Sequence, residues 1–154
     1  MDLLLLSGKK SDILDFCRQS EAVDKIALRT MQIDMLSLQE KLPSVRGAWF
    51  RLKQGFIRAK GYMGDQIQDT AEFCEAKSEG EISTLSFYFL DSRDGCMHPI
   101  MITEDGAVVL QRTYKRVEEE LDLLLQIKKE LLDSIFSLVK PTRSKEHVHF
   151  PSVS

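Results

Sequence analysis

A long amphipathic stretch, Tyr114–Val139, constrains what this chain can fold into more than any other segment. Its apolar residues recur mostly at gaps of three and four, the spacing that places side chains on one face of a helix. The main stripe comprises Tyr114, Val117, Leu121, Leu124, Leu131, Ile135 and Leu138. We predict a long C-terminal amphipathic helix that packs on its own chain through one stripe.

A second apolar stripe on the same predicted helix is predicted to contact a partner. It comprises Leu125, Leu132 and Val139, with Lys128 at its margin. The stem of this lysine can lie along apolar surface while its charge reaches water, or the charge can pair with an acid on a partner helix and fix the register. The predicted partner interface is therefore Leu125, Lys128, Leu132 and Val139.

The segment Ser11–Leu42 is also predicted to be helical, because it has helical apolar spacing and contains neither Gly nor Pro. Its apolar face shifts around the helix axis near Ala27–Met31, which indicates a change of packing surface or a break. Pro43 disfavours the helical conformation for the residue before it, so the helix is predicted to end at Leu42.

A helical period resumes over Ser44–Lys77, but glycines interrupt it at positions 47, 55, 61 and 64. Each costs about 1 kcal/mol relative to alanine inside a helix. They indicate either the close approach of a neighbouring helix or a hinge. We predict a helix over Val45–Lys60, a weak point around Gly61–Gly64 and a second helical piece over Asp65–Lys77.

Strands are predicted after residue 80, where the apolar period changes from that of a helix to two. Asp94-Gly95 and Asp105-Gly106 are short-turn signals flanked by apolar residues. The predicted meander has the strands Ile82–Asp91, Cys96–Thr103 and Ala107–Arg112. Pro99 cannot donate a hydrogen bond to a neighbouring strand, so it predicts a bulge or a strand that begins at Ile100.

Together these segments predict an α+β fold that is mainly helical. Two N-terminal helical segments, the second interrupted, precede a three-stranded antiparallel meander and a long C-terminal amphipathic helix. A single helical-rich domain is predicted over residues 1–141, followed by a flexible C-terminal tail over residues 142–154.

Composition excludes several classes of protein but indicates no particular reaction. The 154 residues carry a formal charge of −3, which argues against general binding to nucleic acid. Three widely separated cysteines predict neither a disulfide framework nor a zinc site. The sequence lacks the pattern of a signal peptide and any apolar run of about 18 residues. An intracellular location, cytoplasmic or nuclear, is therefore predicted.

The segment Arg46–Lys60 gathers the strongest local charge. Its basic residues are Arg46, Arg51, Lys53, Arg58 and Lys60, interleaved with Trp49, Phe50 and Phe56. Such a pattern can lie on an anionic lipid surface or a phosphate backbone. We interpret it first as the solvated side of an amphipathic helix, because Trp49, Leu52 and Phe56 would share the opposite face. An acidic protein partner is the next interpretation, and membrane or nucleic acid is a minor one.

The other candidates for chemistry have simpler interpretations. We interpret His98 as a structural histidine, because sequence spacing fixes no acid or cysteine beside it. His147-Val148-His149 lies in the predicted tail, which is a poor metal cage. The motifs GxSxG, GxxxxGK[ST], GxGxxG and HExxH are absent from the sequence. We predict no catalytic residues, no cofactor and no metal.

The resulting functional prediction is a non-enzymatic protein–protein interaction subunit of an intracellular assembly. Its amphipathic helices would form a coiled-coil or bundle interface in a homo- or hetero-oligomer. At the level of fold class, a small acidic chain of this order resembles the dimeric chaperones that escort bacterial secretion effectors. That resemblance implies a homodimer that binds an unfolded segment. Binding of nucleic acid or lipid through the basic segment is the less favoured alternative.

Overall fold

The computed structural model describes residues 6–23, 31–135 and 140–141, and it divides the chain into two compact units, Met1–Thr30 and Met31–Ser154. In the first unit the described element is the helix α1 (Lys10–Val23). The predicted single helix to Leu42 is wrong, because strand β1 (Met31–Gln32) and helix α2 (Met35–Lys41) follow. The predicted shift of the apolar face falls largely on residues 24–30, outside the described residues.

Helix α2 begins and ends for local reasons. The Asp34 carboxylate accepts a hydrogen bond from the Ser37 backbone N–H at 3.2 Å and so caps the first turn. At the other end Leu42 is extended, with φ −85° and ψ 127°. Pro43 disfavours the helical conformation at Leu42. Helix α2 ends at Lys41, so the predicted end at Leu42 is confirmed to within one residue.

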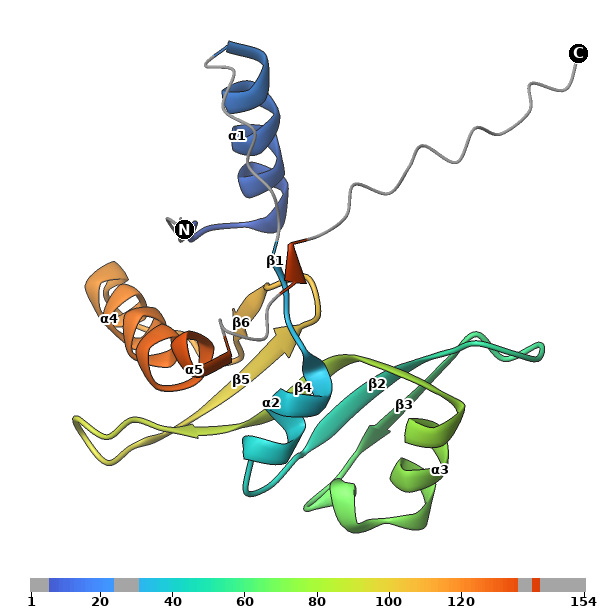
Figure 1. Ribbon diagram of the computed structural model, residues 1–154. Helices are drawn as coiled ribbons and strands as arrows, with labels where there is room; N and C mark the ends of the chain where they lie inside the picture. The colour runs from blue at the N-terminus through green and yellow to red at the C-terminus, as the bar shows by residue number, and fades with distance from the viewer. Residues whose placement is uncertain (1–5, 24–30, 136–139, 142–154) are drawn as a thin grey trace, which may run out of the picture. The chain divides into compact units, whose positions relative to one another are not determined.

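The second unit is built on a five-stranded antiparallel sheet of order β3-β2-β4-β5-β6 (Figure 1). Its strands are β2 (Gly47–Leu52), β3 (Ala59–Met63), β4 (Gly80–Leu90), β5 (Met97–Thr103) and β6 (Val108–Leu110). A separate two-stranded pair joins β1 to β7 (Lys140–Pro141). The predicted mainly helical fold with a three-stranded meander is therefore wrong, because the sheet has five strands and organises the core.

The largest error concerns the predicted helix Val45–Lys60, which is a β-hairpin. Strand β2 pairs with β3 in the register Gly47↔Met63 to Arg51↔Ala59. Gly55, between the strands, has φ +90°, a conformation that L-residues rarely adopt. The glycines that weakened the helix prediction are thus part of a hairpin. The following piece is closer to expectation, since the 3₁₀ turn η1 (Ile67–Asp69) and the helix α3 (Ala71–Glu79) replace Asp65–Lys77.

Strands β4, β5 and β6 lie within about two residues of their predicted positions, in a larger sheet than expected. Pro99 neither starts nor bulges β5, contrary to the prediction, and it pairs with Tyr88. Its carbonyl accepts a hydrogen bond from the Gln111 N–H at 3.0 Å, on the side of β6. In an antiparallel sheet, the N and the C=O of one residue point to the same side of the strand. The Pro99 nitrogen therefore faces β6, just beyond the last residue of that strand. The missing N–H of proline thus removes no hydrogen bond to β4.

The helices of the second unit pack on one face of the sheet, which we call the inner face. Helix α2 packs on β4, α3 packs on β2 and β4, and α4 (Val117–Ile127) follows β6 (Figure 1). The core contains aliphatic and aromatic side chains from both layers: Met35, Leu38, Phe50, Phe73, Ile82, Leu85, Phe87, Ile100, Ile102, Leu123 and Ile127. Phe50 is central, with edge-to-face contacts to Tyr62 and Phe73 at ring-centroid distances of 6.1 and 5.2 Å.

The C-terminal helix differs from the predicted Tyr114–Val139 at its start and in its middle. It begins at Val117, and after α4 the backbone continues as a π-helical segment, η2 (Lys128–Leu132), and a short α5 (Asp133–Ile135). Residues 136–139 and the predicted tail, 142–154, lie outside the described residues. The single-domain boundary at residue 141 stays a prediction. Among the described residues, no helix combines the length and apolarity needed to cross a membrane.

Candidate functional site

The sheet face opposite the helices is the most extensive candidate surface. We call it the open face and define it by the apolar residues Trp49, Met63, Tyr88, Leu90, Met97, Met101 and Val109. Five of these, Met63, Tyr88, Leu90, Met97 and Val109, are between 41% and 79% exposed. Within the second unit, the described helices contribute their buried residues to the core on the inner face instead.

The register of the strands makes the open face continuous across β4, β5 and β6. Leu90 lies opposite Met97, and Met101 lies opposite Val109. Tyr88 lies opposite Pro99, which fills the space between these two pairs. Paired side chains on one face of an antiparallel sheet lie about 4.5–5.5 Å apart at Cβ, so these residues form one apolar surface.

Trp49 extends this surface onto β2 and β3. Its indole lies over Gly61, its partner across the hairpin, where a Cβ atom would come within 3.0 Å of the ring. A β-bulge follows Trp49, whose carbonyl accepts a hydrogen bond from the Ser83 hydroxyl at 3.0 Å. The ring is half-buried by the sheet beneath it, so a large aromatic side chain lies flat at one end of the open face.

Two arginines of the predicted anionic-partner patch lie at the margin of the open face. The Arg46 guanidinium lies 4.3 Å from the centre of the Tyr88 ring, a cation–π contact. Arg51 binds both carboxylate oxygens of Glu104, at 2.6 and 2.7 Å. Both arginines are therefore held in place by side chains of their own chain.

The predicted patch as a whole does not form the solvated side of a helix, because Arg46–Lys60 is a hairpin. Lys53 pairs with Glu81 at 3.1 Å, and Lys60 pairs with Glu79 at 3.1 Å. Arg58 forms no ion pair with any residue in the described part of the chain. Because carboxylates neutralise most of the patch, an anionic partner would have to displace them. The proposed anionic contact stays a prediction.

The structure separates the residues of the predicted partner interface on the last helix. Leu125 is 54% exposed, and Leu121 and Val117 lie one and two turns before it on the same exposed side. Leu132 instead packs against the core of its own unit. Lys128 pairs with Asp133 at 2.9 Å, an acid of its own helix. Val139 lies outside the described residues. The predicted interface stays untested, but of its three described residues Leu125 alone is a well-exposed apolar residue.

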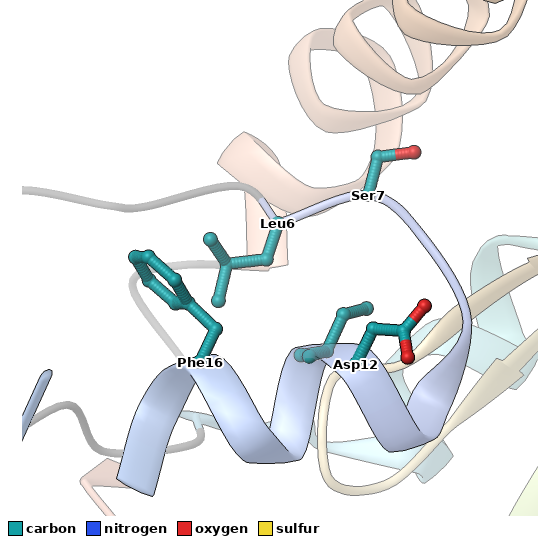
Figure 2. Close-up of a pocket in the computed structure, with 5 residues that line it drawn as sticks. Leu6, Ser7, Asp12 and Phe16 are labelled. Atoms are coloured by element: carbon teal, nitrogen blue, oxygen red, sulfur yellow. The ribbon is translucent and has the colours of Figure 1, made fainter. Parts of the chain in front are cut away.

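Two smaller candidate features are a hollow and a polar cluster. A hollow in the first unit is lined by Leu6, Ser7, Asp12, Ile13 and Phe16, with the Leu6 and Phe16 side chains directed toward one another (Figure 2). Its single carboxylate and single hydroxyl form no catalytic pair. The other feature is a polar cluster in the β4–β5 hairpin formed by Asp91, Asp94 and His98.

Sequence reasoning missed this polar cluster, although a signal for it was present. The turn at Asp94-Gly95 was predicted, and the register that it implies places Asp91 and His98 on the same face of the hairpin.

Comparison of the chain with protein-family models, curated proteins and solved structures gave no match. The function is therefore inferred from the geometry of the described residues.

Proposed function

We propose that this protein is a non-enzymatic protein–protein interaction subunit of an intracellular assembly. The observation that carries the proposal is the open face, a continuous apolar surface on a sheet whose opposite side is covered by helices. Large exposed apolar surfaces rimmed by polar residues are typical of interaction sites. The partner is a protein in a homo- or hetero-oligomer.

The open face rather than a coiled coil is the proposed contact. Fully burying one Leu or Met side chain contributes about 1.5–3 kcal/mol, so several such residues on one surface can offset the loss of freedom on association. The last helix offers less, because its α-helical part covers only Val117–Ile127 and is followed by a π-helical segment. A coiled-coil seam needs several regular heptads.

A second candidate is a dimeric chaperone of the secretion-effector type. Three of the seven open-face residues favour it, because Met63, Met97 and Met101 have unbranched, flexible side chains that adapt to different apolar sequences. Such a protein would be a homodimer that holds an unfolded segment. The two candidates differ in whether the bound partner is folded.

The test compares two double variants that introduce the same charge at different surfaces. L90E/M97E places two carboxylates on the open face, at directly paired positions of β4 and β5. F56E/I57E places two carboxylates in the exposed turn between β2 and β3, away from that face. Because burying an unpaired carboxylate is costly, we expect L90E/M97E to reduce partner binding at least about tenfold and F56E/I57E to leave it unchanged.

Binding is measured in two ways, after circular dichroism has shown that both variants are folded. Sedimentation velocity of the purified chain reports self-association, and quantitative co-purification from the native cell reports other partners. Loss of association in L90E/M97E alone supports the proposal. A monomeric wild-type chain whose co-purifying proteins are equally retained by both variants would contradict it. The chaperone is favoured if a protease degrades the partner when it is free but not when it is bound to this chain.

A further inference from the structure

The β4–β5 hairpin brings two carboxylates and an imidazole together. The loop is closed by hydrogen bonds from Asp91 N–H to Cys96 C=O at 2.9 Å and from Gly95 N–H to Asp91 C=O at 2.8 Å. The Asp94 carboxylate caps the turn by accepting from the Cys96 N–H at 2.8 Å. In this conformation, one ligand atom from each of Asp91, Asp94 and His98 lies within 4.8 Å of the others.

The His98 ring has one bound nitrogen and one unpartnered nitrogen. It is only 6% exposed, and its Nδ1 lies 2.7 Å from the Tyr114 hydroxyl. Its Nε2 is buried and has no hydrogen-bond partner among the described residues. The nearest charged atom is Asp94 Oδ2 at 3.9 Å, which places the free nitrogen in the carboxylate cluster. Leaving such a buried nitrogen unpaired is unfavourable, so this position favours a bound ligand.

Asp91 supplies a buried negative charge on the other side of the cluster. It is 2% exposed and is held by Arg93, which donates to Oδ1 at 3.1 Å from Nε and to Oδ2 at 2.8 Å from Nη2. This two-point contact is a charge-assisted ion pair between the carboxylate and the guanidinium. Each carboxylate oxygen has two lone pairs, and Oδ2 accepts only one of these bonds, so it can still bind a cation.

We propose that Asp91, Asp94 and His98 form a binding site for a divalent transition-metal ion such as Zn²⁺. Neutral imidazole nitrogen and carboxylate oxygen are ordinary ligands of this ion, and water would complete the coordination. With Nδ1 protonated and donating to Tyr114, Nε2 presents its lone pair to the metal. A partner on the second ring nitrogen is the usual support of a metal-bound histidine.

Binding requires a small closure of the hairpin. Bonds of about 2.0–2.2 Å around a tetrahedral zinc ion place the ligand atoms about 3.3 Å apart, closer than the present limit of 4.8 Å. Asp94 lies in the exposed part of the turn and can move toward His98, while Arg93 is 45% exposed and can turn into water. The ion would join the tip of the hairpin to Tyr114, which precedes α4. It would therefore stiffen the end of the sheet that carries Leu90 and Met97.

The experiment is a calorimetric titration of the metal-free full-length chain with Zn²⁺. All proteins carry the H147Q/H149Q substitutions, because His147 and His149 could bind the same ion. We expect one equivalent of Zn²⁺ to bind. D94N, which keeps an acceptor for the Cys96 N–H, should weaken affinity at least about tenfold, and H98Q should do the same. D105N is the matched control, because it alters the Asp-Gly turn of the next hairpin, and its affinity should equal that of the parent.

Titration with Co²⁺ identifies the ligands independently of stability. A bound Co²⁺ spectrum without a thiolate charge-transfer band excludes Cys17, Cys74 and Cys96 as the source of binding. Circular dichroism confirms that D94N and H98Q are folded. Absence of Zn²⁺ binding in the H147Q/H149Q parent overturns the proposal. Binding that is equally strong in folded D94N, D105N and H98Q also overturns it.

Discussion

Replacing Phe50 with alanine is expected to lower the free energy of unfolding by about 3–5 kcal/mol. The side chain is fully buried in β2 and makes edge-to-face contacts with Tyr62 and Phe73. Its removal loses both the apolar area and these ring contacts and leaves a cavity in the centre of the core. A chain of this size has a total stability of about 5–15 kcal/mol, so the loss is a large fraction of the whole.

Phe56→Ala is the matched control, since Phe56 is the same residue type in the same hairpin but is fully exposed. It should change the free energy of unfolding by less than about 0.5 kcal/mol. Urea denaturation followed by tryptophan fluorescence measures both variants, with Trp49 as the single reporter.

This pair of variants also distinguishes the hairpin from the helix that the sequence predicts. A helix over Val45–Lys60 places Phe56 on the apolar face with Trp49 and Leu52, and it leaves Phe50 off that face. The helix therefore predicts the larger loss for Phe56→Ala. Equal effects, or a larger effect at Phe56, would contradict the described hairpin.

The helical prediction failed at this segment for physical reasons that can be traced to particular residues. Strand β2 alternates between the two faces of the sheet, but Trp49 on the open face is as apolar as Phe50 on the inner face. The sequence therefore lacks the apolar–polar alternation that identifies a strand. Phe56 and Ile57 are apolar although they lie in an exposed turn, so they prolong an apparent helical period. By contrast, β4 keeps a period of two from Leu85 to Phe89 and is followed by Asp94-Gly95, which is why this strand was predicted to within two residues.

The candidate site was predictable only in part, because its residues meet through the register of the strands. The open face needs β2 and β3 to be recognised as strands, since Trp49 and Met63 otherwise belong to helices. The polar cluster needs the burial of His98 beside Tyr114, which sequence spacing does not show. On the last helix, the spacing correctly indicated buried positions at Leu124 and Ile135, but it did not show that Val117 is exposed.

Replacing Gly80 with alanine is expected to destabilise the protein by about 3 kcal/mol, the upper end of the range for overpacking. Gly80 ends α3 and begins β4, directly beside β2. Its backbone is extended, so the conformation itself permits other residues. A Cβ atom, however, would lie 2.1 Å from the carbonyl oxygen of Arg51. That oxygen belongs to the backbone of a central strand, so it can move away only if β2 separates from β4.

Gly61→Ala is the control that separates this contact from the general effect of replacing a strand glycine. A Cβ atom at Gly61 would meet the Trp49 ring at 3.0 Å, but a half-buried side chain can rotate where a backbone carbonyl cannot. Alanine also restricts the unfolded chain, which by itself stabilises the folded state by about 0.4–1 kcal/mol. The two effects oppose each other at Gly61, so thermal unfolding should change little there and fall sharply for Gly80→Ala. Equal losses in the two variants would show that β4 does not approach β2 as closely as described, and the order of the five-stranded sheet would then be in question.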